Sequence, residues 1–157
     1  FPTRRSSDLL TYQGPLFHVD KVGGGHSTVA SNLQEPSSIV VFDGDLYYVE
    51  QVGSNGLDGG GVRKIAVGGG VPTTVLHSGG GLLLDVAADA SGVYATATNG
   101  GTGSLVRASA AATPNELAST PNAVYGMVRT SATAIYWTVA WTGSPPADGA
   151  SVRKLCK

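Results

Sequence analysis

The chain has 157 residues, a length that suits one domain with its own core. Charged residues make up only 13% and the formal net charge is −1, which excludes a strong field for nucleic acid or an anionic membrane surface. No apolar run approaches the roughly 20 residues of a membrane-spanning helix, and the single cysteine, Cys156, excludes a disulfide within the chain.

The first nine residues, FPTRRSSDL, fit none of the patterns that follow. They resemble the in-frame translation of a common sequencing-adapter oligonucleotide. We therefore expect residues 1–9 to be a non-native scar and exclude them from the fold. Residues 10–157 are then expected to be a fragment of a longer parent chain. The pair Arg4-Arg5 does not read as an export signal, because no apolar segment follows it.

From residue 10 onward, short apolar stretches alternate with turns, and 23 of the 157 residues are glycine. Turn signals include Asp43-Gly44 and three Gly-Gly-Gly triplets, since glycine accepts positive φ at no steric cost. The sequence therefore predicts strands without helices, at 16–22, 27–33, 39–42, 46–51, 62–67, 73–77, 83–88, 93–98, 105–109, 116–119, 124–129, 135–141 and 152–155.

Two short motifs repeat along this series of strands. Leu46-Tyr47, Val93-Tyr94 and Ile135-Tyr136 each open a strand, with the tyrosines 47 and 42 residues apart. A basic trio of the Val-Arg-Lys type opens the next strand each time, at 62–64, 105–107 and 152–154. The strands then group in chain order as two, four, four and three. Units of four strands and about 40–45 residues are typical of β-propeller blades.

We therefore predict an all-β fold, a partial β-propeller of about three and a half four-stranded antiparallel blades. The blade boundaries are expected near residues 34, 80 and 121. The second strand of each unit is largely apolar on both faces, as in Ile135-Tyr136-Trp137. A sheet with one solvated face would alternate apolar and polar residues, so this pattern indicates that neighbouring blades cover both sides.

The segment 135–138 (IYWT) followed by 152–154 (VRK) resembles the YWTD-type six-bladed propeller repeat. Residues 63–70 (RKIAVGGG) and 72–79 (PTTVLHSG) resemble the Gly-rich tandem propeller repeats of bacterial secreted or surface proteins. The chain departs from the YWTD pattern at the fourth position, where Glu50, Ala97 and Val139 replace the usual aspartate. The resemblance implies a ring of about six blades, completed by missing blades of the parent chain.

Candidate ligand contacts lie where the loops between second and third strands gather on one face of a propeller. Asp58 and Asp148 are in these loops and would offer a carboxylate to Ca²⁺ or a polar ligand, although Asp-Gly is also a common turn. Trp141, at the mouth of its strand, would offer a platform for a sugar ring or pack between blades.

A second candidate group lies at the start of the innermost strands. Glu35, Asp85 and Asn122 carry oxygen atoms that would converge on a central channel and hold a divalent ion. Six-bladed lactonases of the gluconolactonase type bind a metal in such a place, where it would polarise a lactone carbonyl and activate water. Polar residues at strand ends also commonly do no more than face water.

The sequence contains no catalytic signature, so we predict no catalytic residues and no cofactor beyond Ca²⁺ or another divalent ion at these sites. The leading hypothesis is a non-enzymatic binding module of an exported or surface bacterial protein, extracellular or periplasmic. It would bind a protein or glycan through the Gly-rich loop face, without nucleic acid or membrane insertion. The alternatives are a metal-dependent lactonase, hydrolase or lyase with a site in the channel, and a purely structural repeat array.

Overall fold

The computed structural model describes residues 13–19, 22, 24–51, 60–142 and 150–157. These residues form thirteen β-strands and contain no helix, so the all-β prediction is confirmed. No helix within these ranges is long and apolar enough to span a membrane. The predicted scar at residues 1–9 lies outside the described residues.

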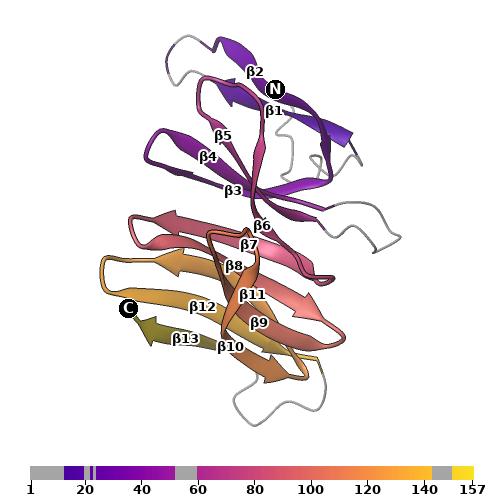
Figure 1. Cartoon of the computed structure of the whole chain (residues 1–157), viewed down its shortest axis with the longest axis vertical. Helices are drawn as coiled ribbons and strands as arrows, with labels where there is room; N and C mark the ends of the chain where they lie inside the picture. Colours follow the sequence, from indigo (N-terminus) through magenta and orange to yellow (C-terminus); the bar gives the residue numbers. More distant parts are fainter. Residues whose placement is uncertain (1–12, 20–21, 23, 52–59, 143–149) are drawn as a thin grey trace.

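The strands form four antiparallel sheets that follow one another in chain order and are stacked along the long axis of the molecule (Figure 1). Sheet I contains β1 (Gln13–Val19) and β2 (His26–Gln34). Sheet II has the order β3 (Pro36–Phe42), β4 (Asp45–Glu50), β5 (Gly61–Ala66) and β6 (Thr73–His77). Sheet III has the order β7 (Leu82–Asp89), β8 (Gly92–Asn99), β9 (Thr102–Ala108) and β10 (Pro114–Pro121). Sheet IV contains β11 (Ala123–Thr130), β12 (Ala134–Trp141) and β13 (Ser151–Cys156).

The repeated motifs of the sequence occupy equivalent places in sheets II, III and IV. The tyrosine that opens the second strand pairs with the basic residue of the third strand, in the pairs Tyr47 with Lys64, Tyr94 with Arg107 and Tyr136 with Lys154. In the last two pairs the cation lies 5.9 Å from the centre of the tyrosine ring, within the range of a cation–π interaction. The sequence repeat is therefore a repeated cross-strand pair.

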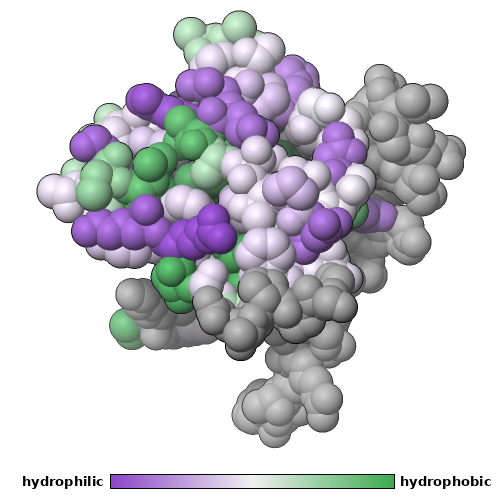
Figure 2. Space-filling view, turned by 90° about the horizontal axis from the view of Figure 1, so that it is seen from below, coloured by the Kyte–Doolittle hydropathy of each residue, from purple (hydrophilic) through white to green (hydrophobic). Residues whose placement is uncertain are grey.

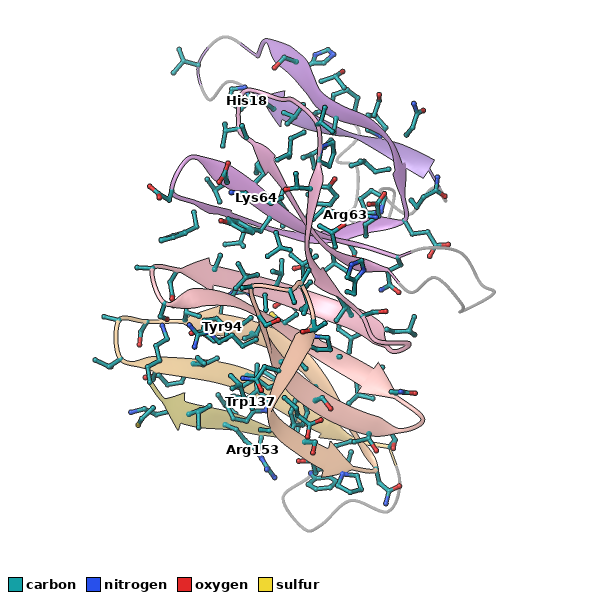
Figure 3. The ribbon with its side chains drawn as sticks, viewed as in Figure 1. His18, Arg63, Lys64, Tyr94, Trp137 and Arg153 are labelled. Atoms are coloured by element: carbon teal, nitrogen blue, oxygen red, sulfur yellow. The ribbon has the colours of Figure 1, made fainter. Side chains whose placement is uncertain are left out.

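The core consists of three apolar layers, each between two consecutive sheets. Tyr48 of β4 packs with Leu33 of β2 between sheets I and II, and Val62 packs with Val86 between sheets II and III. Between sheets III and IV, Tyr94 and Trp137 lie in one buried cluster (Figure 3). Sheets II and III thus bury both faces, as the apolar second strands predicted.

The last sheet presents its other face outward. Tyr136 is 37% exposed and Val152 is 71% exposed, whereas Ile135 and Trp137, which alternate with Tyr136 along β12, are buried against sheet III. Figure 2 views the molecule from below Figure 1 and shows apolar and hydrophilic side chains side by side on this side. Sheet IV therefore has one face packed in the core and one face that carries exposed apolar side chains.

Two buried tyrosines differ in whether their hydroxyl groups have partners. The Tyr125 hydroxyl lies 2.7 Å from the Thr120 hydroxyl, and both groups are buried. The Tyr48 hydroxyl has no hydrogen-bond partner within the described residues, and burial, with the nearby Glu50 carboxylate, raises its pKa to about 12.

We expect Tyr125→Phe to lower the free energy of unfolding by about 1 kcal/mol, because it leaves the Thr120 hydroxyl buried and unpaired. Tyr48→Phe should leave stability unchanged or raise it by up to about 1 kcal/mol, since it removes a buried group without a partner. Urea unfolding of the two variants against the wild type measures both changes. Equal losses in the two variants would contradict the difference in hydrogen bonding.

Candidate functional site

The innermost strands of sheets II, III and IV lie next to one another, with β7 in contact with both β3 and β11. Asp85 of β7 is 9% exposed and lies at the centre of this arrangement. Its Oδ1 atom accepts a hydrogen bond from the Ser38 hydroxyl of β3. Its Oδ2 atom accepts one from the Val128 amide at 2.8 Å and one from Arg129 Nη1 at 2.7 Å, both from β11. One carboxylate thus joins three sheets.

Irregular pairing in each of the three strands helps to place these groups. The register shifts between Ser37 and Ile39, between Leu83 and Asp85, and between Tyr125 and Val128, each time against the second strand of the same sheet. Such bulges leave residues out of the ladder and redirect side chains. Ser38 has φ of 37°, and its Oγ atom also accepts a hydrogen bond from the Val86 amide at 3.2 Å.

The other two members of the predicted channel group lie elsewhere along their strands. Glu35 and Asn122 have φ of 43° and 55° and stand at the turns before β3 and β11. Asp85 instead lies within β7, paired with Thr96 of β8. The three residues therefore do not lie at equivalent positions along their strands. Within the described ranges, no group of three His, Cys, Asp or Glu residues could hold a metal ion.

Of the predicted loop-face residues, Asp58 and Asp148 lie outside the described residues. Trp141 is the last residue of β12 and is half-buried, pairing with Ala123 and packing against the layer between sheets III and IV. The ring therefore contributes to the packing between sheets III and IV while part of it faces solvent.

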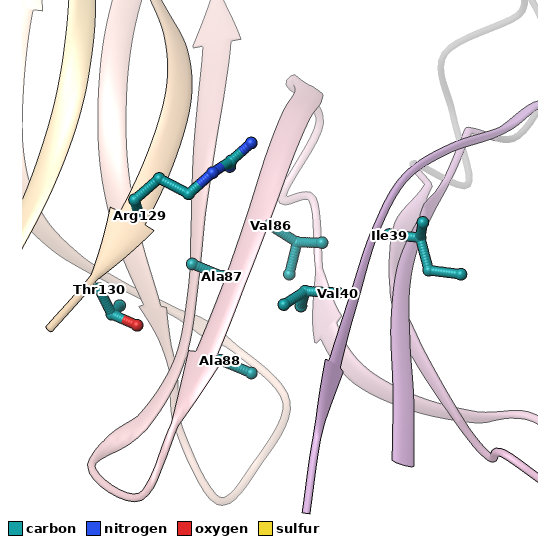
Figure 4. Close-up of a pocket in the computed structure, with 7 residues that line it drawn as sticks. All are labelled: Ile39, Val40, Val86, Ala87, Ala88, Arg129 and Thr130. Atoms are coloured by element: carbon teal, nitrogen blue, oxygen red, sulfur yellow. The ribbon is translucent and has the colours of Figure 1, made fainter. Parts of the chain in front are cut away.

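A hollow of about 270 Å³ lies along β3, β7 and β11 (Figure 4). We call it the inner-strand hollow. Its lining is Ile39 and Val40 from β3, Val86, Ala87 and Ala88 from β7, and Arg129 and Thr130 from β11. In Figure 4 Arg129 extends from β11 toward β7, Val86 and Val40 lie between β7 and β3, and Ile39 projects on the far side of β3.

A second hollow, of about 180 Å³, lies where the connection from β6 to β7 meets sheet III. We call it the loop-edge hollow. It is lined by Ser78, Gly79, Gly81, Ala97, Asn99, Ser104, Val106, Pro114 and Glu116. The Glu116 carboxylate accepts a hydrogen bond from the Ser104 hydroxyl at 3.0 Å. This hollow brings a connection between two sheets next to the turn between β8 and β9, and its polar groups could bind a hydrophilic ligand.

Sequence reasoning missed the residues that pair with the buried carboxylates. Arg129 is in no repeated motif, and nothing in the sequence marks it as the partner of Asp85. Glu50 accepts hydrogen bonds from the Gln34 amide at 2.8 Å and from Arg63 Nε at 3.0 Å, which joins β4 to β5 and to the end of β2. The position of Glu50, at the place of the aspartate in the YWTD pattern, was the one available signal.

Asp89, at the turn between β7 and β8, forms an ion pair with Lys157 and accepts a hydrogen bond from the Ser91 amide at 2.7 Å. Burial alone would raise the pKa of Asp89, but the hydrogen bonds from Lys157 and Ser91 outweigh it and lower the pKa to about 2. The ion pair thus attaches the end of the chain to sheet III.

The lowered pKa of Asp89 makes stability depend on pH in acid. Because the unfolded state takes up this proton first, the stabilisation is complete above about pH 4 and is lost as pH falls toward 2. We expect Asp89→Asn to cost about 1 kcal/mol at pH 7, the upper value for a pair near the surface. Thermal unfolding between pH 2 and 7 should show a smaller pH dependence in the variant below pH 4. An unchanged profile would contradict this role.

Comparison with known proteins finds no matching family model and no matching curated protein. Among solved structures, this chain is similar to one from a structural and mechanistic study of two prolyl endopeptidases and their inter-domain dynamics. The TM-score is 0.52 and the sequence identity is 8%, over 93% of this chain and 24% of the other. The chain thus spans about a quarter of that protein, and at this identity the likeness concerns the fold alone.

Proposed function

We propose that this chain is part of a β-propeller, about three and a half blades, and serves as a non-enzymatic binding module. Three features support the propeller: consecutive antiparallel sheets, innermost strands that lie next to one another, and apolar layers between successive sheets. The similar prolyl endopeptidase also contains a propeller domain, which favours the same fold here.

The contacts of Asp85 favour a structural role for the inner strands over a catalytic one. Both carboxylate oxygens accept hydrogen bonds from protein donors, on Ser38, Val128 and Arg129. A metal ligand at this position would have to give up some of these bonds, and the Val128 amide, which is buried, would lose its partner.

The loop-edge hollow is the observation that carries the binding proposal. Asn99, Ser104 and Glu116 bring polar side chains to this hollow beside the glycines of the β6–β7 connection, so donors and acceptors lie together in one hollow. We infer that it holds a hydrophilic part of a partner, either a glycan or a polar protein segment. Asp58 and Asp148, which the sequence predicts on the loop face, lie outside the described residues. The assignment to an exported or surface bacterial protein rests on the Gly-rich repeat resemblance.

The test is a double variant, Asn99→Ala with Glu116→Ala, compared with the wild type on a glycan array and on an array of polar peptides. We expect binding on one array and its loss in the double variant. Lys64→Ala is the matched control, because Lys64 lies on sheet II and pairs with Asp45, away from the residues of this hollow. Binding that survives the double substitution, or that is absent from both arrays, would count against the proposal.

The metal-dependent alternative has its own test. Stoichiometric binding of a divalent ion that Asp85→Ala abolishes would support that alternative.

A further inference from the structure

The third strand of sheet IV has a free edge, unlike the third strands of sheets II and III. β5 lies between β4 and β6, and β9 lies between β8 and β10. Within the described residues, β13 pairs with β12 alone (Figure 1). The backbone N–H and C=O groups along its other edge therefore have no strand to pair with, and such an edge is a template for another strand.

Val152 of β13 is far more exposed than the residues at the same repeat position in the other sheets. Val62 of β5 and Leu105 of β9 are each 0% exposed, whereas Val152 is 71% exposed. The two buried residues face Leu76 and Ala118 of the fourth strands and pack with them in apolar layers. The fourth strand and the following sheet thus both cover this position, and β13 has neither within the described residues.

Sheets II and III pair their third and fourth strands in the same register. The residue after a proline faces the basic residue that ends the repeated trio, the next residue faces the middle of the trio, one apolar residue is left out of the ladder, and a second apolar residue faces the start of the trio. The pairs are Lys64 with Thr73, Arg63 with Thr74 and Val62 with Leu76 in sheet II, and Arg107 with Asn115, Val106 with Glu116 and Leu105 with Ala118 in sheet III. This shared register gives the positions that a strand added to residues 152–154 would take.

Arg153 also lacks the partner that its equivalent has in sheet II. Arg63 forms an ion pair with Glu50 at 3.0 Å. Val139 stands at the place of Glu50 in sheet IV. Arg153 is exposed (Figure 3) and forms no ion pair with a described residue. A carboxylate on an added strand, at the place that Glu116 has in β10, would therefore pair with an unpaired cation.

We propose that the free edge of β13 binds an extended segment of a partner protein as an added antiparallel strand. The segment has a proline, a small polar residue, an acidic residue and two apolar residues in this order. The acidic residue faces Arg153, and the second apolar residue faces Val152. Backbone hydrogen bonds supply the affinity and these side chains supply the specificity. The edge is distinct from the loop-edge hollow and does not rest on the function proposed for that hollow.

A peptide with the sequence of residues 113–120 has this pattern and serves as the probe. In sheet III the Ser109 hydroxyl lies 2.7 Å from the Thr113 hydroxyl, and Cys156, which is exposed, stands at the place of Ser109 in sheet IV. The peptide with Thr113→Cys should therefore form a mixed disulfide with Cys156 of the full chain in a glutathione buffer. The peptide with Thr120→Cys instead should give about tenfold less adduct by mass spectrometry, because the register puts that end far from Cys156.

A charge exchange tests the position of the acidic residue. Arg153→Glu in the chain places two carboxylates opposite each other and should lower the yield with the Thr113→Cys peptide about fivefold. Adding Glu116→Lys to the peptide should restore the yield, because the pair is then again of opposite charge. Arg153 is exposed, so this variant keeps the fold.

Three results would overturn the proposal. The first is an equal yield from the two cysteine positions in the peptide, and the second is an unchanged yield in Arg153→Glu. The third is a Cys156–Cys156 dimer that forms in preference to either peptide adduct, which would show that the edge binds a second copy of the chain.

Discussion

Replacing Asp85 by alanine is expected to lower the free energy of unfolding by about 3 kcal/mol. The substitution leaves the Val128 amide without its acceptor in a fully buried position, which costs about 1–3 kcal/mol. It also removes the bonds from Ser38 and Arg129. Breaking a buried ion pair commonly costs 3–5 kcal/mol. The lower end applies because Arg129 is 65% exposed and regains water when its partner is lost.

Urea unfolding followed by tryptophan fluorescence measures this loss, since both tryptophans, Trp137 and Trp141, lie in sheet IV. Asp45→Ala is the matched control: Asp45 pairs with Lys64 at 2.8 Å on the surface, and its removal should cost less than about 1 kcal/mol. If Asp85→Ala is no less stable than Asp45→Ala, the carboxylate does not hold the three sheets together. The inner strands would then be open to the metal-binding alternative.

The repeat spacing was sufficient to predict the strand order from the sequence. Tyr47, Tyr94 and Tyr136 recur because each occupies the same cross-strand position, opposite a basic residue of the next strand. Apolar residues on both faces of these strands indicated that neighbouring sheets would cover them, and the three apolar layers confirm it. Local periodicity and turn chemistry report such features because they arise within one unit of about 45 residues.

The role of Asp85 could not be predicted in the same way, because its partners are far away in the sequence. Ser38 is 47 residues before it and Val128 is 43 residues after it, each in another sheet. The sequence predicted Asp85 at the start of an innermost strand, in a position equivalent to those of Glu35 and Asn122. A bulge shifts the register, so residues at the same distance from a strand's start need not be neighbours in space. The sequence showed no turn signal at Ser38 that would reveal the bulge there.

Gly103 of β9 lies where sheet IV packs closely against sheet III. A methyl group at this position would stand 2.6 Å from the Tyr125 ring and 2.9 Å from the Ala123 carbonyl oxygen. The Tyr125 ring has little freedom to move, because its hydroxyl is hydrogen-bonded to Thr120 and the ring contacts the tilted Trp137 ring, with ring centres 5.8 Å apart. Glycine is therefore needed here for close approach.

Gly103→Ala should lower the free energy of unfolding by about 2 kcal/mol. Overpacking a rigid contact costs about 1–3 kcal/mol, and the reduced freedom of the unfolded chain returns less than about 1 kcal/mol. Gly68→Ala is the control, since a methyl group there meets nothing within 4 Å, so its stability should be equal to or slightly above the wild type. Urea unfolding of both variants measures these two changes in the free energy of unfolding. Surface substitutions usually change the free energy of unfolding by no more than about 0.5 kcal/mol. If Gly103→Ala stays within that range of the wild type, sheet IV does not pack closely against β9.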